Sequence, residues 1–419
     1  MISRTERLLN ELIKLHPKYI DLSLNRLKLL LEKLGNPHFD LPKTIHIAGT
    51  NGKGSIQSFI RNILVSNGYT CDSYISPHLT KFNERIVLNN KEVSTQKLYN
   101  TLNFVKKIND DEQITFFEIT TAAAFVLFQK SNSDFLILET GLGGRLDATN
   151  IIPKKLCSII TPISFDHEEF LGNTIKKITN EKLGIVRKND FCIISKQNKE
   201  VNNIIIKKLK KNKKTYFYGK TFRIKKIDNK VYQFIFRRKK ILIDKLKLNG
   251  LHQIENASVA LAFAEIMHEK NLNINFKKIN KVITNTFWPG RLEILNYNNK
   301  KIILDGSHNI EGAKKLTHFL KENQIKPEVI FGMLNNKKMF GFLKIIKNQI
   351  RNILAIQIPQ EKNSFLTSEI KEQCSLISIK CLEIKNFSEV IKHIILSEQK
   401  YFLITGSLYL VGKIRTKFL

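Results

Sequence analysis

Residues 44–55 of the chain read Thr-Ile-His-Ile-Ala-Gly-Thr-Asn-Gly-Lys-Gly-Ser, and this stretch decides the fold. The first five residues form a β-rich run, a glycine loop follows, and residues 56–65 have a helical pattern. A strand, a glycine loop and a helix in this order are typical of a phosphate-binding loop, because backbone N–H groups and the helix N-terminus face the phosphate oxygens. The loop departs from the common GxxxxGK[ST] pattern, since Gly54 separates Lys53 from Ser55. A glycine-rich turn with a chance lysine is the alternative interpretation.

The loop residues form the first candidate site. Lys53 can reach the outer phosphates of a nucleotide, and the Ser55 hydroxyl can ligate Mg2+. We therefore expect the loop to bind ATP through Asn51, Gly52, Lys53, Gly54 and Ser55.

Length and composition indicate a globular protein of more than one domain. A chain of 419 residues exceeds one ordinary core and predicts two or three domains. No apolar run approaches the ~18 residues that a membrane helix needs, and the N-terminus has no apolar signal-peptide core. We expect a cytoplasmic protein with no membrane partner.

The formal net charge of +32 taken alone suggests nucleic acid or an anionic membrane as partner. The lysines are spread along the chain together with Asn and Ile, as in residues 201–208, which is the composition that an AT-rich genome favours. No aromatic-interleaved basic motif of the RNA-binding kind is present in the sequence. We expect no nucleic-acid partner, and a basic nucleic-acid-binding protein with a vestigial loop is the alternative from another class.

The five cysteines predict neither a disulfide framework nor a zinc site. Their number is odd, and no two of them have the CxxC spacing. We expect five free thiols.

Short β-type runs alternate with helical patterns along most of the chain. Alternation of this kind predicts a mainly parallel sheet with helices on both faces. The expected strands include 73–75, 135–138, 158–161 and 191–195, and the expected helices include 120–129, 175–186 and 252–268. Residues 215–248 instead combine short β-type runs with charges and suggest a small antiparallel sheet.

A second alternation follows Trp288-Pro289-Gly290, where Pro and Gly together indicate a boundary. We predict an α/β fold with a P-loop-type, mainly parallel sheet domain followed by a smaller Rossmann-like α/β domain. The predicted division is 1–287 for the domain that carries the ATP-binding loop, 288–297 for a linker, and 298–419 for the C-terminal domain.

Two polar residues lie where the strands of an open α/β sheet present ligands. Glu139 directly follows the apolar run 135–138, and Asp166-His167 lies just past the strand expected at 158–161. Glu139 is a candidate metal ligand, with a capping or salt-bridged role as the alternative. From the residues alone, a structural role explains His167 better than a role as a metal ligand.

Eight strings of the chain resemble the folylpolyglutamate synthase and dihydrofolate synthase family. They occur in the family's order and cover nearly the whole chain. The strings are HIAGTNGKGS (46–55), SPHL (76–79), LETGLGGRLDATN (138–150), DH (166–167), EKLGI (181–185), PGRL (289–292), DGSHN (305–309) and TGSLY (405–409).

The resemblance implies two Mg2+ sites and a modified lysine. The family's matching residues ligate a first magnesium through Ser76 and Glu139, together with Ser55, and a second through His167. Lys182 matches a lysine that is carbamylated in the family, and its new carboxylate orders the site near the second metal. The implied catalytic residues are Lys53, His167 and Lys182.

The resemblance also implies residues that bind the two larger substrates. ATP contacts are implied for Asn256, Arg291, Asp305 and His308 in addition to the loop, and an Arg beside a domain linker suits closure over phosphates. Contacts to the pterin substrate are implied for Thr115, Phe116, Phe117, Glu118, Leu146, Asp147 and Ala148. A core role for Phe116 and Phe117 is the alternative, since a double Phe before a helix is usually buried.

The activity that the resemblance implies is ATP-dependent addition of L-glutamate to dihydropteroate, to reduced folates, or to both, through an acyl phosphate. We expect a monomer. One departure lies at residues 22–26, where Leu-Ser-Leu-Asn-Arg replaces the family's usual Leu-Gly-Leu-Glu-Arg, and the detailed pterin contacts of this segment stay open. A Mur-type cell-wall peptide ligase is the nearest alternative, but the loop begins at Gly49 and we expect no nucleotide-sugar domain before it.

Overall fold

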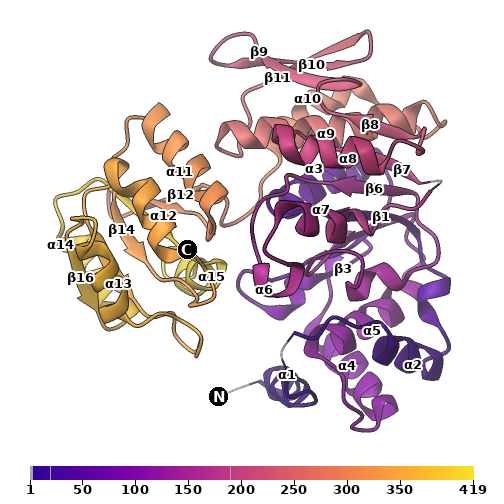
Figure 1. Ribbon diagram of the computed structural model, residues 1–419, viewed down its shortest axis with the longest axis horizontal. Helices are drawn as coiled ribbons and strands as arrows, with labels where there is room; N and C mark the ends of the chain where they lie inside the picture. The colour runs from indigo at the N-terminus through magenta and orange to yellow at the C-terminus, as the bar shows by residue number, and fades with distance from the viewer. Residues whose placement is uncertain (1–2, 19, 189) are drawn as a thin grey trace. The chain divides into compact units, whose positions relative to one another are not determined.

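The computed structural model describes residues 3–18, 20–188 and 190–419 and divides into two compact units. Unit 1 comprises Met1–Lys245 and Glu255–Thr284, and unit 2 comprises Leu246–Ile254 and Asn285–Leu419. Both units have a sheet with helices packed against it (Figure 1). The predicted α/β class, with a mainly parallel sheet followed by a smaller α/β unit, is confirmed.

Unit 1 is built on an eight-stranded sheet in the order β4-β3-β2-β5-β1-β6-β7-β8. The pairs from β2 to β8 are parallel, and β3 and β4 add antiparallel at one edge. The strands are β1 Lys43–Ala48, β2 Cys71–Tyr74, β3 Ile86–Leu88, β4 Lys91–Glu92, β5 Phe135–Glu139, β6 Cys157–Ile160, β7 Phe191–Ile194 and β8 Thr215–Phe217. Strands buried on both faces read as near-continuous apolar runs, as β5 does.

Helices cover the large sheet of unit 1. Helix α3 packs against β1, β2 and β5, whereas α5 joins α1, α2 and α4 in a core with Leu136 and Leu138 of β5. The helices are α1 Arg4–Ile13, α2 Asn25–Lys33, η1 Pro37–Phe39, α3 Lys53–Ser66, η2 Phe82–Arg85, α4 Thr95–Asn109, α5 Phe116–Gln129, η3 Ala148–Ile151, α6 Glu168–Leu171, α7 Ile175–Leu183, α8 Lys199–Lys208, α9 Leu251–His268 and α10 Phe276–Asn285.

The segment expected as a small antiparallel sheet divides in two. Strands β9 Phe222–Lys226, β10 Val231–Phe236 and β11 Lys239–Asp244 form an antiparallel sheet of their own, as predicted. The first part of the segment differs, because β8 pairs parallel with β7 and extends the large sheet. The short run Thr215–Phe217 therefore follows the parallel pattern of the preceding strands.

Unit 2 is built on a six-stranded sheet in the order β12-β13-β17-β14-β15-β16, parallel except for β12. Strand β12 lies within the expected linker 288–297, so regular sheet structure begins before residue 298. The elements are β12 Glu293–Tyr297, β13 Lys300–Leu304, α11 Ile310–Glu322, β14 Glu328–Phe331, α12 Met339–Ile346, η4 Lys347–Gln349, β15 Ile353–Ile356, α13 Thr367–Ser375, β16 Cys381–Ile384, α14 Phe387–Leu396, β17 Tyr401–Thr405 and α15 Leu408–Arg415.

Two further expectations concern the chemistry of the whole chain. The five cysteines are free thiols in the structure, as predicted. None of the helices in the described part of the chain combines the length and apolar character that crossing a bilayer requires.

Candidate active site

The glycine loop connects the buried strand β1 to helix α3, and its conformation depends on glycine. Gly49 has φ +153° and Gly52 has φ +90°, backbone angles that residues with a side chain rarely adopt. A Cβ atom on Gly49 would lie 1.9 Å from Thr161 Oγ1, so the loop backbone is pressed against the segment that follows β6. The backbone N–H groups of Thr50 and Asn51 donate to the Pro162 carbonyl at 3.0 and 3.3 Å.

Because the N–H groups of Thr50 and Asn51 donate to Pro162, we expect a phosphate to be bound by the N–H groups in the first turn of α3. The helix begins at Lys53 with Gly52 as its N-cap, so the predicted residues Gly52 to Ser55 lie at its N-terminus. The first four N–H groups of a helix have no intrahelical acceptor, and the helix dipole adds partial positive charge there. This geometry suits an anion such as a phosphate group.

Two lysines converge on the loop from different helices. Lys53 Nζ lies 3.3 Å from the Gly49 carbonyl oxygen and 3.6 Å from Glu139 Oε1. Lys182 Nζ, from α7, donates to the same Gly49 oxygen at 3.1 Å, and Lys182 is only 4% exposed. The structure thus brings Lys53 and Lys182 to one backbone carbonyl and places Glu139 beside Lys53.

Three of the four predicted metal ligands lie at the carboxyl ends of strands of the large sheet, and the fourth, Ser55, lies in the first turn of α3. Glu139 is the last residue of β5, Ser76 follows β2, and His167 follows β6, with β1 between β5 and β6. His167 is the N-cap of α6 with φ +51°, and its Nε2 lies 3.8 Å from Asp166 Oδ1. This is the edge at which open α/β sheets bind ligands.

The donor atoms at this edge fit a hard cation. Ser76 Oγ is buried and has no hydrogen-bond partner among the described residues, and a buried hydroxyl without a partner is costly. Hydroxyl and carboxylate oxygens are the ligands that Mg2+ prefers. Within the described part of the chain, no three His, Cys, Asp or Glu residues cluster as a metal site, so a cation here would combine the Glu139 carboxylate with serine and phosphate oxygens.

Asn256, the residue predicted to contact ATP from α9, lies against the loop. It is 2% exposed, and a Cβ atom on Gly52 would lie 2.8 Å from its Oδ1. The side chain therefore packs over the backbone of Gly52, and only glycine fits there.

The segment Thr115–Glu118 forms the N-terminal cap and first turn of α5. Thr115 and Glu118 form a reciprocal capping box, and Glu118 Oε2 also accepts a hydrogen bond from Arg26 Nε at 3.2 Å. The pair Phe116-Phe117 lies inside the helix, whereas the sequence pattern placed it before the helix. Phe116 is buried, whereas Phe117 is half-buried and its ring packs over Gly141.

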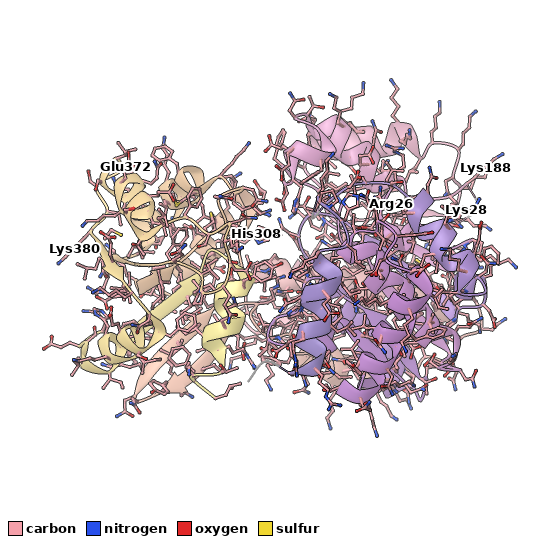
Figure 2. All side chains as sticks on the ribbon, turned by 90° about the horizontal axis from the view of Figure 1, so that it is seen from below. Arg26, Lys28, Lys188, His308, Glu372 and Lys380 are labelled. Atoms are coloured by element: carbon pink, nitrogen blue, oxygen red, sulfur yellow. The ribbon has the colours of Figure 1, made fainter. Side chains whose placement is uncertain are left out.

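Arg26 was missed as a candidate from the sequence (Figure 2). It also donates to Asp21 Oδ2 at 3.1 Å and so links the N-terminal segment to Glu118 across 92 residues. The only signal was that Arg26 ends the segment 22–26. No local spacing connects it with Glu118.

The segment Leu146–Ala148 precedes and enters η3 between β5 and β6. Asp147 caps η3 and is 2% exposed, and its Oδ2 accepts from the Leu142 N–H at 2.8 Å. Burial raises the pKa of Asp147, and the hydrogen bonds from Leu142 and Thr149 oppose that rise. Asp147 therefore closes its own loop, and Ala148 is buried beside it.

The three predicted ATP contacts of unit 2 gather around Gly306. Arg291 Nη1 would lie 3.4 Å from a Cβ atom on Gly306, and His308 Nδ1 lies 3.2 Å from the Gly306 carbonyl oxygen. Asp305 accepts from the N–H groups of Leu292 and Ser307, both at 3.1 Å. Burial raises the pKa of Asp305, while Ser307 and the nearby Arg291 oppose the rise.

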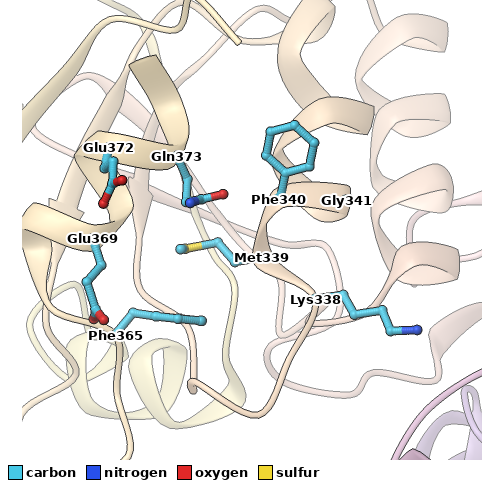
Figure 3. Close-up of a pocket in the computed structure, with 8 residues that line it drawn as sticks. All are labelled: Lys338, Met339, Phe340, Gly341, Phe365, Glu369, Glu372 and Gln373. Carbon is cyan, nitrogen blue, oxygen red and sulfur yellow. The ribbon is translucent and has the colours of Figure 1, made fainter. Parts of the chain in front are cut away.

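A separate pocket of about 440 Å³ in unit 2 contains none of the predicted residues (Figure 3). It is lined by residues of and beside α12 and α13, including Met339, Phe340 and Gln373. We therefore assign it no part in the candidate site.

A glycine loop with two converging lysines, at the carboxyl edge of a parallel sheet, is the site of a nucleotide-binding α/β enzyme. The family model described as "Mur ligase middle domain" matches residues 47–264. At the next level, the chain belongs to the dihydrofolate synthase/folylpolyglutamate synthase family.

Two relatives and two solved structures match nearly the full chain. The dihydrofolate synthase/folylpolyglutamate synthase of Bacillus subtilis is 32% identical, with 94% of each chain covered, and the dihydrofolate synthetase of Saccharomyces cerevisiae is 29% identical, with 94% and 97% covered. Escherichia coli FolC, solved in complex with DHPP and ADP, has a TM-score of 0.88 at 25% identity, with 99% and 97% covered. The folylpolyglutamate synthase of Thermotoga maritima has a TM-score of 0.83 at 33% identity, with the same coverage.

A glycine pair tests the geometry of the loop. Gly52→Ala should weaken ADP binding about tenfold, because its Cβ would press on Asn256 at a φ of +90° that alanine adopts only with strain. Gly68→Ala is the matched control, since Gly68 has φ +88° but nothing within 4 Å of a Cβ. Calorimetric titration with ADP measures both variants. Equal affinities would show that the contact between Gly52 and Asn256 does not shape the nucleotide site.

Proposed function

We propose that this chain is an ATP-dependent ligase that joins L-glutamate to dihydropteroate, to reduced folates, or to both. The observation that carries the proposal is that Lys53 and Lys182 converge on the Gly49 carbonyl, with Glu139 beside Lys53, in the loop that precedes the α3 N-terminus. Family membership supplies the substrate class, and the E. coli relative is described as bound to DHPP and ADP.

A carboxylate is a poor electrophile, because it is anionic and stabilised by resonance. We infer that transfer of the γ-phosphoryl group of ATP to the substrate carboxylate gives an acyl phosphate and ADP. The glutamate amine then attacks the acyl carbon, an amide forms, and inorganic phosphate leaves. Both steps develop negative charge on phosphoryl oxygens, and preorganised cations stabilise such charge most effectively in a water-poor site.

Each residue of unit 1 has a role that follows from its position. Lys53, on the first turn of α3, would stabilise the transferring phosphoryl group, and the N–H groups of Gly52 to Ser55 would bind phosphate oxygens. Asn256 would contact the nucleotide beside Gly52. Ser55, Ser76 and Glu139 would hold one Mg2+ and His167 would contribute to a second. Bound Mg2+ would neutralise charge on the phosphates.

Lys182 is the residue whose unmodified state is hardest to explain. Its ammonium group and that of Lys53 donate to the same carbonyl oxygen, so two like charges are close neighbours in a partly buried site. Carbamylation would remove the conflict, because addition of the Lys182 amine to CO2 releases a proton and replaces the cation with an anion. This anion would face Lys53 and the second metal.

The remaining residues would hold the other substrates. In unit 2, Arg291, Asp305 and His308 gather around Gly306 and would bind ATP. In unit 1, Thr115, Phe117, Glu118 and the segment Leu146–Ala148 would contact the pterin ring, whereas Phe116 contributes mainly to the core. The protein would act as a monomer in the cytoplasm.

The proposed activity predicts glutamate-dependent release of ADP from ATP in the presence of dihydropteroate or tetrahydrofolate, each supplied separately with Mg2+ and bicarbonate. Lys53→Ala should reduce kcat at least about a hundredfold, since a charge-stabilising donor is lost from the transition state. Lys107→Ala, an exposed lysine of α4, is the control and should retain wild-type turnover. The wild type failing with both acceptors would overturn the proposal, and an active Lys53→Ala variant would overturn the role of the loop.

Carbamylation of Lys182 predicts a carbamate signal in the 13C NMR spectrum of the protein prepared with 13C-bicarbonate. The signal should be absent from Lys182→Ala, and turnover of the wild type should fall when bicarbonate and CO2 are removed. Full activity together with no carbamate signal would contradict carbamylation of Lys182 but would not contradict the ligase proposal.

A further inference from the structure

A chain of buried polar side chains lies on one face of the large sheet of unit 1. It runs from Lys155, just before β6, through His46 on β1 and Thr149 in η3 to Asp147. His46 and Thr149 are fully buried, Asp147 is 2% exposed, and the side chain of Lys155 is also fully buried. Neither Lys155, His46 nor Thr149 has a role in the ligase mechanism described above.

The strand register explains why His46 can reach the loop after β5. Across the sheet, His46 pairs with Leu138 of β5 and Ser158 of β6, so these three share one face. Glu139 is the last residue of β5 and the phosphate loop follows β1, whereas His46 faces the segment 140–156 that connects β5 to β6. That segment contains Asp147, Thr149 and Lys155.

In each hydrogen bond of this series, the donor lies on the side of Lys155 and the acceptor on the side of Asp147. The Thr149 hydroxyl donates to Asp147 Oδ1 at 2.5 Å, so its single hydrogen is used. Its oxygen, 2.7 Å from His46 Nε2, must therefore accept a hydrogen from that nitrogen. Burial holds the pKa of His46 well below its usual value, which leaves the ring neutral and Nδ1 unprotonated.

Lys155 provides the donor that His46 Nδ1 needs. Its Nζ lies 3.5 Å from Nδ1 and 3.4 Å from Asn150 Oδ1, and it also donates to the Ile185 carbonyl. An ammonium group donates and never accepts, so it imposes the tautomer with hydrogen on Nε2. Each link then determines the next, from Lys155 to the carboxylate of Asp147.

This series of hydrogen-bonded side chains ends at Asp147, in the segment assigned to the pterin substrate. Asp147 Oδ1 also accepts from the Thr149 N–H at 3.0 Å, while Oδ2 accepts from Leu142 N–H. The carboxylate thus ties both ends of the turn 142–149. A satisfied buried network of this kind specifies one conformation, because every alternative leaves a buried polar group without a partner.

We propose that Lys155 and His46, acting through Thr149, are positioning residues that hold Asp147 and the segment 146–148 in the conformation that binds the pteridine-bearing acceptor. This inference rests on the proposed function. It assigns these residues an effect on the acceptor and none on ATP, because their hydrogen bonds lead to the turn 142–149, whereas Lys53 lies on α3 and Asn256 on α9.

Titration of Lys155 gives a second way to test the series of hydrogen bonds from Lys155 to Asp147. Burial lowers the pKa of Lys155 to about 8, and Arg187 contributes, whereas Asp190, Cys192 and Cys157 oppose the shift and neutral His46 faces the same amine. The ammonium donor is therefore present below about pH 8 and is lost above it. A neutral amine can also accept, so the opposite tautomer of His46 becomes available and the Thr149 bond to Asp147 is no longer enforced.

The test compares KM for the acceptor with KM for ATP in four variants. Lys155→Met and Thr149→Val should raise the KM for dihydropteroate or tetrahydrofolate about fivefold, as expected for one lost hydrogen bond, with kcat and the KM for ATP within about twofold of wild type. Thr149→Ser keeps the hydroxyl and should restore a low KM. Lys154→Met, an exposed neighbour, is the matched control. In the wild type, acceptor KM should rise from pH 7 to pH 9, and this rise should be absent from Lys155→Met.

Three results would overturn the inference. Unchanged acceptor KM in folded Lys155→Met and Thr149→Val would exclude a positioning role. A fall in kcat together with similar rises in the KM values for the acceptor and for ATP, and a lowered melting temperature, would indicate a general structural role instead. A wild type that is inactive with both acceptors would overturn the proposed function, and this inference with it. If the wild type is active and the variants have an unchanged acceptor KM, only the inference fails.

Discussion

The carbonyl oxygen of Gly49 is the point on which the candidate site of unit 1 depends. It accepts hydrogen bonds from Lys53 and Lys182, which belong to two different helices. Contact with Thr161 excludes any side chain at Gly49, and the register of β1 places Gly49 beside the end of β5, where Glu139 lies. Strand β1, the loop and both lysines are therefore coupled, because a shift of this one peptide group would disturb the hydrogen bonds of Lys53 and Lys182.

The parts of the protein that depend on local pattern could be predicted from the sequence. The apolar runs at β1 and β5, the glycine loop and the start of α3 follow from periodicity and from the conformational freedom of glycine. The resemblance then brought in residues such as Lys182, whose surroundings no local pattern reveals. The parallel pairing of β8 was missed, because Thr215–Phe217 is too short to show which neighbour it joins.

Contacts between distant residues could not be predicted, and several of them shape the site. Arg26 and Glu118 are 92 residues apart, His46 and Thr149 are 103 apart, and Lys155 and His46 are 109 apart. In a chain this rich in lysine, nothing local distinguishes the buried Lys155 from its exposed neighbour Lys154. Only the sheet register, which brings β1 and the segment 140–156 together, makes the difference.

The central claim is that the chain activates a substrate carboxylate by phosphorylation. It is tested most directly with dihydropteroate whose carboxylate oxygens are labelled with 18O, turned over with unlabelled ATP and L-glutamate. An acyl phosphate requires that the inorganic phosphate released in each turnover contains one labelled oxygen, which mass spectrometry of the phosphate detects. Amide formation with unlabelled phosphate would contradict the account, because the carboxylate oxygen would then have left by another route.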